Sequence, residues 1–291
     1  MISTDEGVLA TMTGRKIGWM LHGPADGRVV GWFHGQPGSR YDVTALSEET
    51  LTRYGVRMLA IDRAGYGDTT PVGLDRRLVA QDMLTVADHL GVGEFPVMAV
   101  SMGGIYALAL AATAPERISK AVLISGHVLP YDDPAIIAGL SEAEQADVGR
   151  LVGGRTAELE AEYAAGAAAM LEDPEGMIRQ LAAGWAPKER ALAETPFVSA
   201  VARSVAFGLS TGHTGLLEDG LRTVSPLEFD LADVRCPVRA IHGTIDDLEP
   251  YANVERMSAR LQDCVVVALP GMGHFGPWLW PDAIFGLLTG A

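Results

Sequence analysis

The stretch Val97-Met98-Ala99-Val100-Ser101-Met102-Gly103-Gly104 joins a predicted β-strand to a predicted α-helix. The surrounding segment, Phe95 to Pro115, contains no charge over 21 residues, which is about the length of a membrane span. We instead expect a buried strand, a sharp turn and a buried helix, because Ser101 and two glycines interrupt the segment. A serine on such a turn occupies strained backbone geometry, so its neighbours two positions away must be small. Ala99 and Gly103 satisfy that requirement.

Ser101 is the candidate nucleophile of this turn. The helix that begins at Met102 directs amide groups, and the positive end of its dipole, towards charge that develops near the Ser101 oxygen. Ala99 stands where glycine is commoner, but alanine is also small. The alternative is a serine that only opens the helix, as serine often does.

A second motif, His34-Gly35-Gln36-Pro37-Gly38-Ser39, directly follows a strand that we expect to end at Phe33. Glycine and proline at this point predict a tight loop with amide groups at the edge of the sheet. We therefore expect the backbone N–H groups of Gln36 and Met102 to form an oxyanion hole. The alternative is an ordinary turn at the end of the strand.

Seven histidines are candidates for the base that a serine nucleophile needs. His34 and His242 lie beside glycines at strand ends, so we interpret them as residues that organise the backbone. His274, in Pro270-Gly271-Met272-Gly273-His274-Phe275, follows the last predicted strand and opens a loop at the same sheet edge. It is therefore the predicted base.

The predicted acid is Asp246, three residues beyond the glycine that ends the preceding strand. Asp247 and Glu249 are neighbours that could replace it, and spacing favours Asp246. The order along the chain is then Ser101, Asp246 and His274, which is the order of an α/β-hydrolase triad.

β-branched runs alternate with helical patterns at both ends of the chain, which predicts a mostly parallel sheet flanked by helices. Residues 127–231 differ: they are rich in Ala, Glu and Leu, and Ser141 with Glu144 forms a capping-box pattern. We predict a core of residues 1–126 and 232–291, with residues 127–231 inserted as a helical lid. The expected strands are Lys16–Leu21, Val29–Phe33, Val56–Ile61, Phe95–Val100, Ala121–Ile124, Pro237–Ile241 and Cys264–Leu269. The expected helices are Asp42–Tyr54, Leu74–Leu90, Met102–Ala114, Thr156–Leu171 and Tyr251–Leu261, with others after Pro174, Pro196 and Pro277.

Composition narrows the class of protein. The 291 residues carry a formal charge of −15, which disfavours nucleic acid and anionic membranes as partners. Two isolated cysteines and an N-terminus without a signal-peptide pattern indicate a cytoplasmic protein. We expect no cofactor and no metal. Gly271 to Gly276 spells G-x-G-x-x-G, but too little chain follows for a dinucleotide-binding unit, and no metal-ligand spacing occurs.

The chain resembles the α/β-hydrolase superfamily, in its lidded serine-hydrolase branch, over nearly its whole length. This resemblance implies Ser101 as nucleophile, Asp246 as acid, His274 as base, and the Gln36 and Met102 amides as oxyanion donors. Related families that open epoxides or remove halogen use aspartate at the elbow, which argues against both activities. Proline-specific aminopeptidases share H-G-x-P-G but usually carry G-x-S-W-G-G, from which Ala99 and Met102 depart. The motifs that carry the resemblance are H-G-Q-P-G-S (His34–Ser39), D-R-A-G-Y-G (Asp62–Gly67), A-V-S-M-G-G (Ala99–Gly104), H-G-T-I-D (His242–Asp246) and G-M-G-H-F (Gly271–Phe275).

We expect a hydrolase that cleaves a carboxylic ester, lactone or thioester of a small hydrophobic molecule through an acyl-enzyme. The alternatives are a C–C bond hydrolase of a vinylogous diketone, a cofactor-free perhydrolase and a non-catalytic receptor. The oligomeric state stays open, with a homodimer as one alternative. Apolar side chains of the lid and of the segment after His274 either line the substrate pocket or pack against the core: Met170, Met177, Leu181, Trp185, Phe197, Phe207, Trp278 and Trp280.

Overall fold

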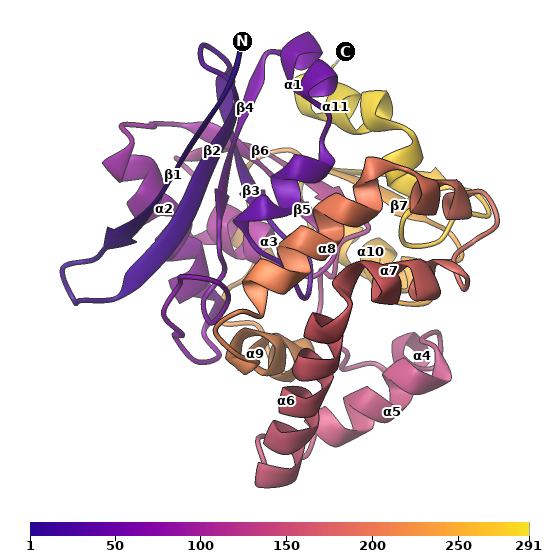
Figure 1. Ribbon diagram of the computed structural model, residues 1–291. Helices are drawn as coiled ribbons and strands as arrows, with labels where there is room; N and C mark the ends of the chain where they lie inside the picture. Colours follow the sequence, from indigo (N-terminus) through magenta and orange to yellow (C-terminus); the bar gives the residue numbers. More distant parts are fainter. Residues whose placement is uncertain (291) are drawn as a thin grey trace.

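The computed structural model describes residues 1–290, and eight strands within them form one sheet (Figure 1). The order across the sheet is β1-β2-β4-β3-β5-β6-β7-β8. β2 is antiparallel to both β1 and β4, and the remaining neighbours are parallel. This arrangement confirms the predicted α/β fold; Ala291, the last residue of the predicted core, lies outside the described residues. The strands are β1 (Ile2–Ala10), β2 (Lys16–Pro24), β3 (Arg28–Phe33), β4 (Val56–Ile61), β5 (Phe95–Val100), β6 (Ile118–Ile124), β7 (Val238–Gly243) and β8 (Cys264–Leu269).

β1 is a strand that the sequence pattern did not predict. Its sequence, ISTDEGVLA, has a run of four polar residues after Ile2 and no residue of the strand is buried, so it lacks the apolar alternation that indicates a strand. It forms because it is the edge strand of a hairpin and pairs with β2 along its whole length, from Ile2 opposite Pro24 to Ala10 opposite Lys16. Main-chain hydrogen bonds, rather than side-chain burial, therefore hold this edge.

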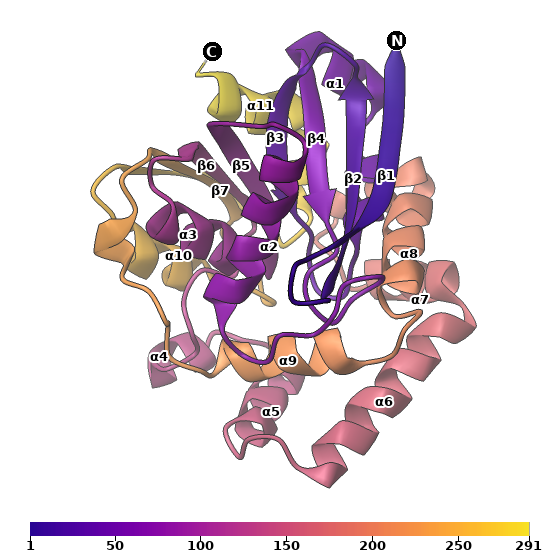
Figure 2. The same cartoon turned by 90° about the vertical axis from the view of Figure 1, so that its left-hand side faces the viewer.

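Helices cover both faces of the sheet (Figure 2). On one face, Val79, Ile105 and Val254 belong to a large buried apolar cluster under α2, α3 and α10. On the other face, Leu51 and Ile284 belong to a second cluster under α1 and α11. Burying one such side chain contributes about 1.5–3 kcal/mol. The bounds are α1 (Glu48–Tyr54), α2 (Arg76–His89), α3 (Gly103–Thr113), α10 (Tyr251–Ser258) and α11 (Pro281–Thr289).

The helix expected over Asp42–Tyr54 is wrong at its start. The chain instead forms a 3-10 helix, η1 (Arg40–Ala45), and then begins α1 anew. The reason is a second cap: the Ser47 hydroxyl accepts a hydrogen bond from Thr50 N at 3.1 Å. The closing helix is likewise divided, into η4 (Gly276–Leu279) and α11, because Pro281 begins a new helix.

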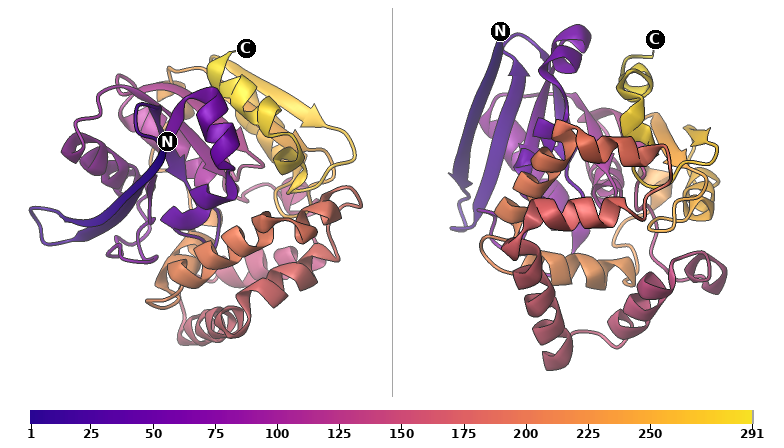
Figure 3. Two further views of the ribbon diagram at one scale, coloured as in Figure 1. Left: turned by 45° about the horizontal axis from the view of Figure 1, so that its top comes forward. Right: turned by 45° about the vertical axis from the view of Figure 1, so that its right-hand side comes forward.

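Residues 127–231, here called the helical segment, lie across the end of the sheet at which the parallel strands terminate (Figures 1 and 3). Half of the expected capping box forms at the start of α5: Ser141 Oγ accepts from Glu144 N at 3.2 Å, whereas Ser141 N donates to Asp247 O and not to the Glu144 side chain. Whether the segment opens as a lid stays a prediction. Its elements are α4 (Pro134–Ile137), α5 (Glu142–Leu151), α6 (Ala157–Glu172), α7 (Pro174–Ala182), η2 (Glu189–Glu194), α8 (Pro196–Gly208), α9 (Thr214–Thr223) and η3 (Leu231–Asp233).

A buried carboxylate on α9 joins the helical segment to the core. Asp219 is fully buried and accepts hydrogen bonds from Arg63 and Tyr66, which follow β4, and from Tyr106 on α3. Arg222, one turn along α9, pairs with the same carboxylate at 3.0 Å. Burial alone would raise the pKa of Asp219, but the two guanidinium groups lower it below its ordinary value. The carboxylate is therefore charged and fully paired.

Asp219→Ala should lower the free energy of unfolding by about 3–5 kcal/mol, because it leaves the buried Arg63 guanidinium without its counter-charge. Urea denaturation followed by circular dichroism measures the change. Glu49→Ala, which removes an exposed partner of Arg53 on α1, is the control and should stay close to wild type. Equal transition midpoints for Asp219→Ala and wild type would contradict the role of this carboxylate.

Candidate active site

Ser101 stands on a sharp turn between β5 and α3. Its φ of 51° lies in the left-handed region, which is unfavourable for a residue with a side chain. Ser101 N donates to Ile124 O at 3.0 Å, and Ser101 O accepts from His127 N at 2.8 Å, so β6 and the loop after it hold the turn on both sides. A side chain at Gly103 would collide with the Phe33 carbonyl at the end of β3. The small residues around Ser101 are therefore required by close backbone packing.

The loop after β3 carries Gln36, one of the two predicted oxyanion donors, and side chains of His34 and Arg63 hold its backbone. His34 Nε2 accepts from Arg63 N at 3.0 Å, and the Arg63 guanidinium donates to Gly35 O at 2.8 Å. These contacts confirm that His34 organises the backbone, and they show that Arg63 does so too. Among residues 1–290, the N–H groups of Gln36 and Met102 donate no hydrogen bond to the protein. Gln36, Met102 and Ser101 line the same cavity.

Asp246 and His274 are in contact. His274 Nδ1 lies 2.9 Å from Asp246 Oδ2, while Asp246 Oδ1 accepts from the N–H groups of Leu248 and Glu249 at 3.1 and 2.9 Å. These bonds fix the carboxylate in the loop after β7. Glu249, one of the two competing acids, instead accepts from Tyr131 OH at 2.8 Å. Within residues 1–290, the acidic side chain that is hydrogen-bonded to His274 is Asp246.

The electrostatics of this pair favour its ionised form. Burial alone would lower the pKa of His274, but the nearby Asp246 carboxylate raises it above its ordinary value of 6.5, with smaller contributions from Glu249 and Glu189. Burial would raise the pKa of Asp246, whereas His274 and His242 lower it well below its usual range. At neutral pH the carboxylate is thus charged and orients the imidazole.

Ser101 and His274 line one cavity of about 740 Å³, but in this structure no hydrogen bond joins the two side chains of residues 101 and 274. This cavity is here called the aromatic lobe. Its wall includes Trp185, Phe197, Phe275 and Trp278, whose rings contact one another, with the Trp185 and Phe275 centroids 4.0 Å apart. Of the eight apolar side chains singled out in the sequence, six line this lobe: Met170, Met177, Leu181, Trp185, Phe197 and Trp278.

The remaining two of these side chains lie elsewhere. Phe207 packs edge-on against Tyr41 with a centroid distance of 4.8 Å, and its ring lies under the Arg40 guanidinium. Trp280 is 42% exposed and does not line the cavity.

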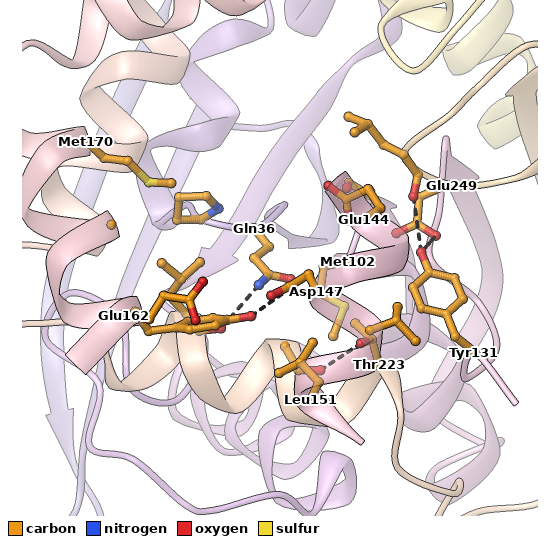
Figure 4. A pocket seen from close by; sticks show the side chains of 18 residues that line it. Gln36, Met102, Tyr131, Glu144, Asp147, Leu151, Glu162, Met170, Thr223 and Glu249 are labelled. Atoms are coloured by element: carbon orange, nitrogen blue, oxygen red, sulfur yellow. Dashed lines mark hydrogen bonds between the residues drawn. The ribbon is translucent and has the colours of Figure 1, made fainter. Parts of the chain in front are cut away.

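A second cavity of about 390 Å³, here called the acidic lobe, adjoins the first at Ser101, Gln36 and Met170 (Figure 4). Its ionisable wall consists of carboxylates and two tyrosines. Burial, with the charges of Asp147, Glu249 and Asp247, raises the pKa of Glu144 to about 7. A substrate bound at Ser101 therefore meets aromatic rings together with four carboxylates in the first cavity, and a wall whose ionisable groups are acids and phenols in the second. The acidic and phenolic side chains are Glu144, Asp147, Glu162, Glu249, Tyr131 and Tyr163.

Two residues of the site gave no signal in the sequence. Asp42 lies in η1, lines the aromatic lobe and accepts from Trp32 Nε1 at 3.2 Å; burial raises its pKa to about 6. Glu189 belongs to the helical segment, yet it accepts a hydrogen bond from Gly273, 84 residues further along the chain. No motif links such distant positions. Within residues 1–290, no three His, Cys, Asp or Glu side chains are grouped to hold a metal ion.

Comparison with known proteins agrees with this geometry. The profile of a family described as "alpha/beta hydrolase fold" matches residues 32–279. The chain belongs to this family. A non-heme chloroperoxidase from Streptomyces lividans is 26% identical over 279 residues, which cover 92% of each chain. A 2-hydroxy-6-oxononadienedioate/2-hydroxy-6-oxononatrienedioate hydrolase from Burkholderia vietnamiensis is 31% identical over 121 residues, covering 40% of this chain and 38% of that protein.

The fold of this α/β hydrolase also matches solved structures. A thermophilic esterase from Thermogutta terrifontis superposes with a TM-score of 0.67 at 19% identity, over 98% of this chain and 97% of the esterase. The predicted membership of the family is confirmed, and the protein is a hydrolase. Within residues 1–290 no helix is both long and apolar enough to span a membrane.

Asp246→Asn should lower the pKa of His274, because the imidazolium loses the neighbouring negative charge that stabilises it. Two-dimensional NMR titration of the histidine side chains measures this pKa, and His274→Gln assigns the resonance. Asp247→Asn is the matched control, since Asp247 is not hydrogen-bonded to His274, and it should change the titration less. A larger shift in Asp247→Asn than in Asp246→Asn would identify Asp247 as the partner.

Proposed function

We propose that this α/β hydrolase is a serine hydrolase that cleaves a carboxylic ester, lactone or thioester through an acyl-enzyme. The observation that carries the proposal is the Asp246–His274 pair, hydrogen-bonded at 2.9 Å, in the cavity that Ser101 enters from its turn. A nucleophile, a base and a carboxylate that orients the base are the groups that acyl transfer needs.

Each group has one role in the proposed reaction. Ser101 Oγ attacks the acyl carbonyl carbon while His274 takes the hydroxyl proton, and Asp246 stabilises the resulting imidazolium. The Gln36 and Met102 amides donate to the oxyanion; removing one such donor typically costs about 3 kcal/mol of transition-state stabilisation. The leaving alcohol or thiol receives the proton from His274. Water, activated by the neutral imidazole, then attacks the acyl-enzyme and releases the acid, with no cofactor.

The two lobes favour a small, hydrophobic and uncharged substrate. The aromatic lobe also disfavours a carboxylate, because Asp42, Glu144, Glu189 and Asp247 lie in its wall and its arginine, Arg190, is exposed. The acidic lobe would repel a carboxylate directly. The acyl group accordingly occupies the aromatic lobe, beside His274, and the leaving group faces the acidic lobe.

This charge distribution separates ester hydrolysis from the C–C bond alternative. The Burkholderia relative is named for a dioate, a substrate with a carboxylate at each end, and its similarity to this chain covers 38% of its length. Whichever way a dioate lay across Ser101, one carboxylate would face the acidic lobe. Aspartate-dependent opening of epoxides is disfavoured because the residue on the turn is Ser101.

Perhydrolysis is the second candidate, favoured by the full-length similarity to a non-heme chloroperoxidase. The same acyl-enzyme would serve: hydrogen peroxide in place of water attacks the acyl carbon, and a peracid leaves while Ser101 regains its proton. The first step is shared, so the two activities differ only in the nucleophile that the cavity admits in the second step.

Ser101→Ala should reduce ester hydrolysis by about four orders of magnitude or more, because no other group there can form the acyl-enzyme. It should also abolish labelling by a fluorophosphonate probe, read on a gel against wild type. Ser210→Ala, an exposed serine after α8, is the control and should be labelled normally at Ser101. If wild type is not labelled and hydrolyses no ester, lactone or thioester, the protein is not a serine hydrolase, and a ligand receptor becomes the better account.

Neutral acyl chains should react faster than anionic ones. We expect kcat/KM for p-nitrophenyl hexanoate to exceed that for the p-nitrophenyl monoester of adipate by about tenfold or more, which corresponds to about 1.4 kcal/mol of unfavourable burial or repulsion. The two esters have equal chain length and differ in a terminal carboxylate. Equal rates, or a preference for the adipate ester, would remove the charge argument and restore a dioate as a substrate.

A further inference from the structure

The loop that carries His274 is held by the helical segment through a carboxylate. Glu189 begins η2, is only 1% exposed, and its Oε1 accepts a hydrogen bond from Gly273 N at 2.5 Å. Gly273 directly precedes His274. A side chain of the helical segment is thus hydrogen-bonded to the main chain next to the proposed base.

A second contact between the same two segments lies immediately beside the first. Trp185, four residues before Glu189, stacks on Phe275 with a ring-centroid distance of 4.0 Å and an interplanar angle of 29°. Phe275 directly follows His274, and its ring lies edge-on to the imidazole at 5.2 Å. The helical segment therefore contacts the residues on both sides of His274.

The glycines of the loop make room for this carboxylate. A Cβ at Gly276 would lie 2.9 Å from Glu189 Oε1, and a Cβ at Gly273 would lie 3.2 Å from Oε2. Neither glycine requires a positive φ, so their conformation alone does not explain them. Gly273 and Gly276 thus leave room for the Glu189 carboxylate, although a Cβ at Gly276 would first meet Met272 Cβ at 2.5 Å, and Gly271 has a positive φ instead.

The contact between Glu189 and the His274 loop also places a carboxylate near the imidazole. The ionisable groups that act on the His274 imidazole are Asp246 and Glu249 from the loop after β7, Glu189 from η2, and Glu144 from α5. Burial raises the pKa of Glu189, while the amides of Gly273 and Phe275 and the charge of His274 favour its ionised form. A charged Glu189 stabilises the imidazolium that forms when His274 takes the serine proton.

We propose that Glu189 is a positioning residue, through which the docked helical segment holds the His274 loop in place for reaction at Ser101. This inference rests on the proposed serine-hydrolase function. Undocking the segment would remove both the hydrogen bond to Gly273 and the Trp185–Phe275 stack, so His274 would be oriented by Asp246 alone. Closure of the helical segment over a substrate then also holds the His274 loop in the position needed for reaction.

The test compares Glu189→Gln and Glu189→Ala with Glu194→Gln, an exposed glutamate of the same 3-10 helix. Glu189→Ala should lower kcat on p-nitrophenyl hexanoate by about tenfold to a hundredfold, with KM changed less than about threefold, because the base is misplaced while the substrate walls remain. Glu189→Gln keeps the side-chain size and one acceptor oxygen, so its kcat should fall less. Glu194→Gln should match wild type in every measurement.

The titration of His274 by NMR supplies a readout that packing alone would not move. Both Glu189 variants should lower the pKa of His274, since each removes a negative charge near the imidazolium; the acid limb of the kcat/KM profile should then move to lower pH. If Glu189→Ala does not fold, Glu189→Gln decides. Wild-type kcat and an unchanged His274 titration in Glu189→Gln would overturn the inference. If wild type lacks activity and probe labelling while the titration still shifts, the proposed function fails and the contact between Glu189 and the His274 loop stands.

Discussion

The site depends on one backbone constraint, the left-handed conformation of Ser101 between β5 and α3. This turn lets α3 begin directly behind Ser101, and Ser101 and Met102 line the same cavity. The turn is possible only because Gly103 allows the Phe33 carbonyl to approach, which fixes β3 and its loop beside β5. The proposed nucleophile and the loop that carries Gln36 therefore both depend on a single close contact between neighbouring strands.

The helical segment completes the site through two buried acids. Asp219 attaches α9 to the core by pairing with Arg63, which also holds the Gly35 carbonyl of the oxyanion loop. Glu189 attaches η2 to the loop of His274. Each carboxylate reaches a loop that carries a proposed catalytic group, so docking of the segment and the order of the site are linked. An α/β hydrolase built in this way can vary its segment for specificity while the sheet edge stays the same.

The elements that the sequence predicted correctly share one physical feature: each is marked by a run of apolar side chains, which indicates a buried element. β5, α3 and β4 are nearly continuous apolar runs, and the structure has them within one or two residues of the predicted bounds. β1 escaped prediction because pairing with β2, rather than burial, makes it a strand. The sequence did not predict the break between η1 and α1. The Ser47 cap starts a new helix at a position where the first helix could also have continued, and the packing of both pieces decides between the two.

The sequence by itself determined the α/β fold, the turn at Ser101, and the loops in which Asp246, His274 and Gln36 lie, because glycines and strand ends mark these loops locally. Only the tertiary structure decided that Asp246, and not Glu249, is hydrogen-bonded to His274. The two residues lie close together in one loop, so their positions in the sequence do not show which side chain points towards His274. It alone also revealed the aromatic and acidic lobes, Asp42, and the reach of Glu189 to Gly273. Such contacts join residues far apart in the chain, and they arise from how the helical segment docks, which no local pattern encodes.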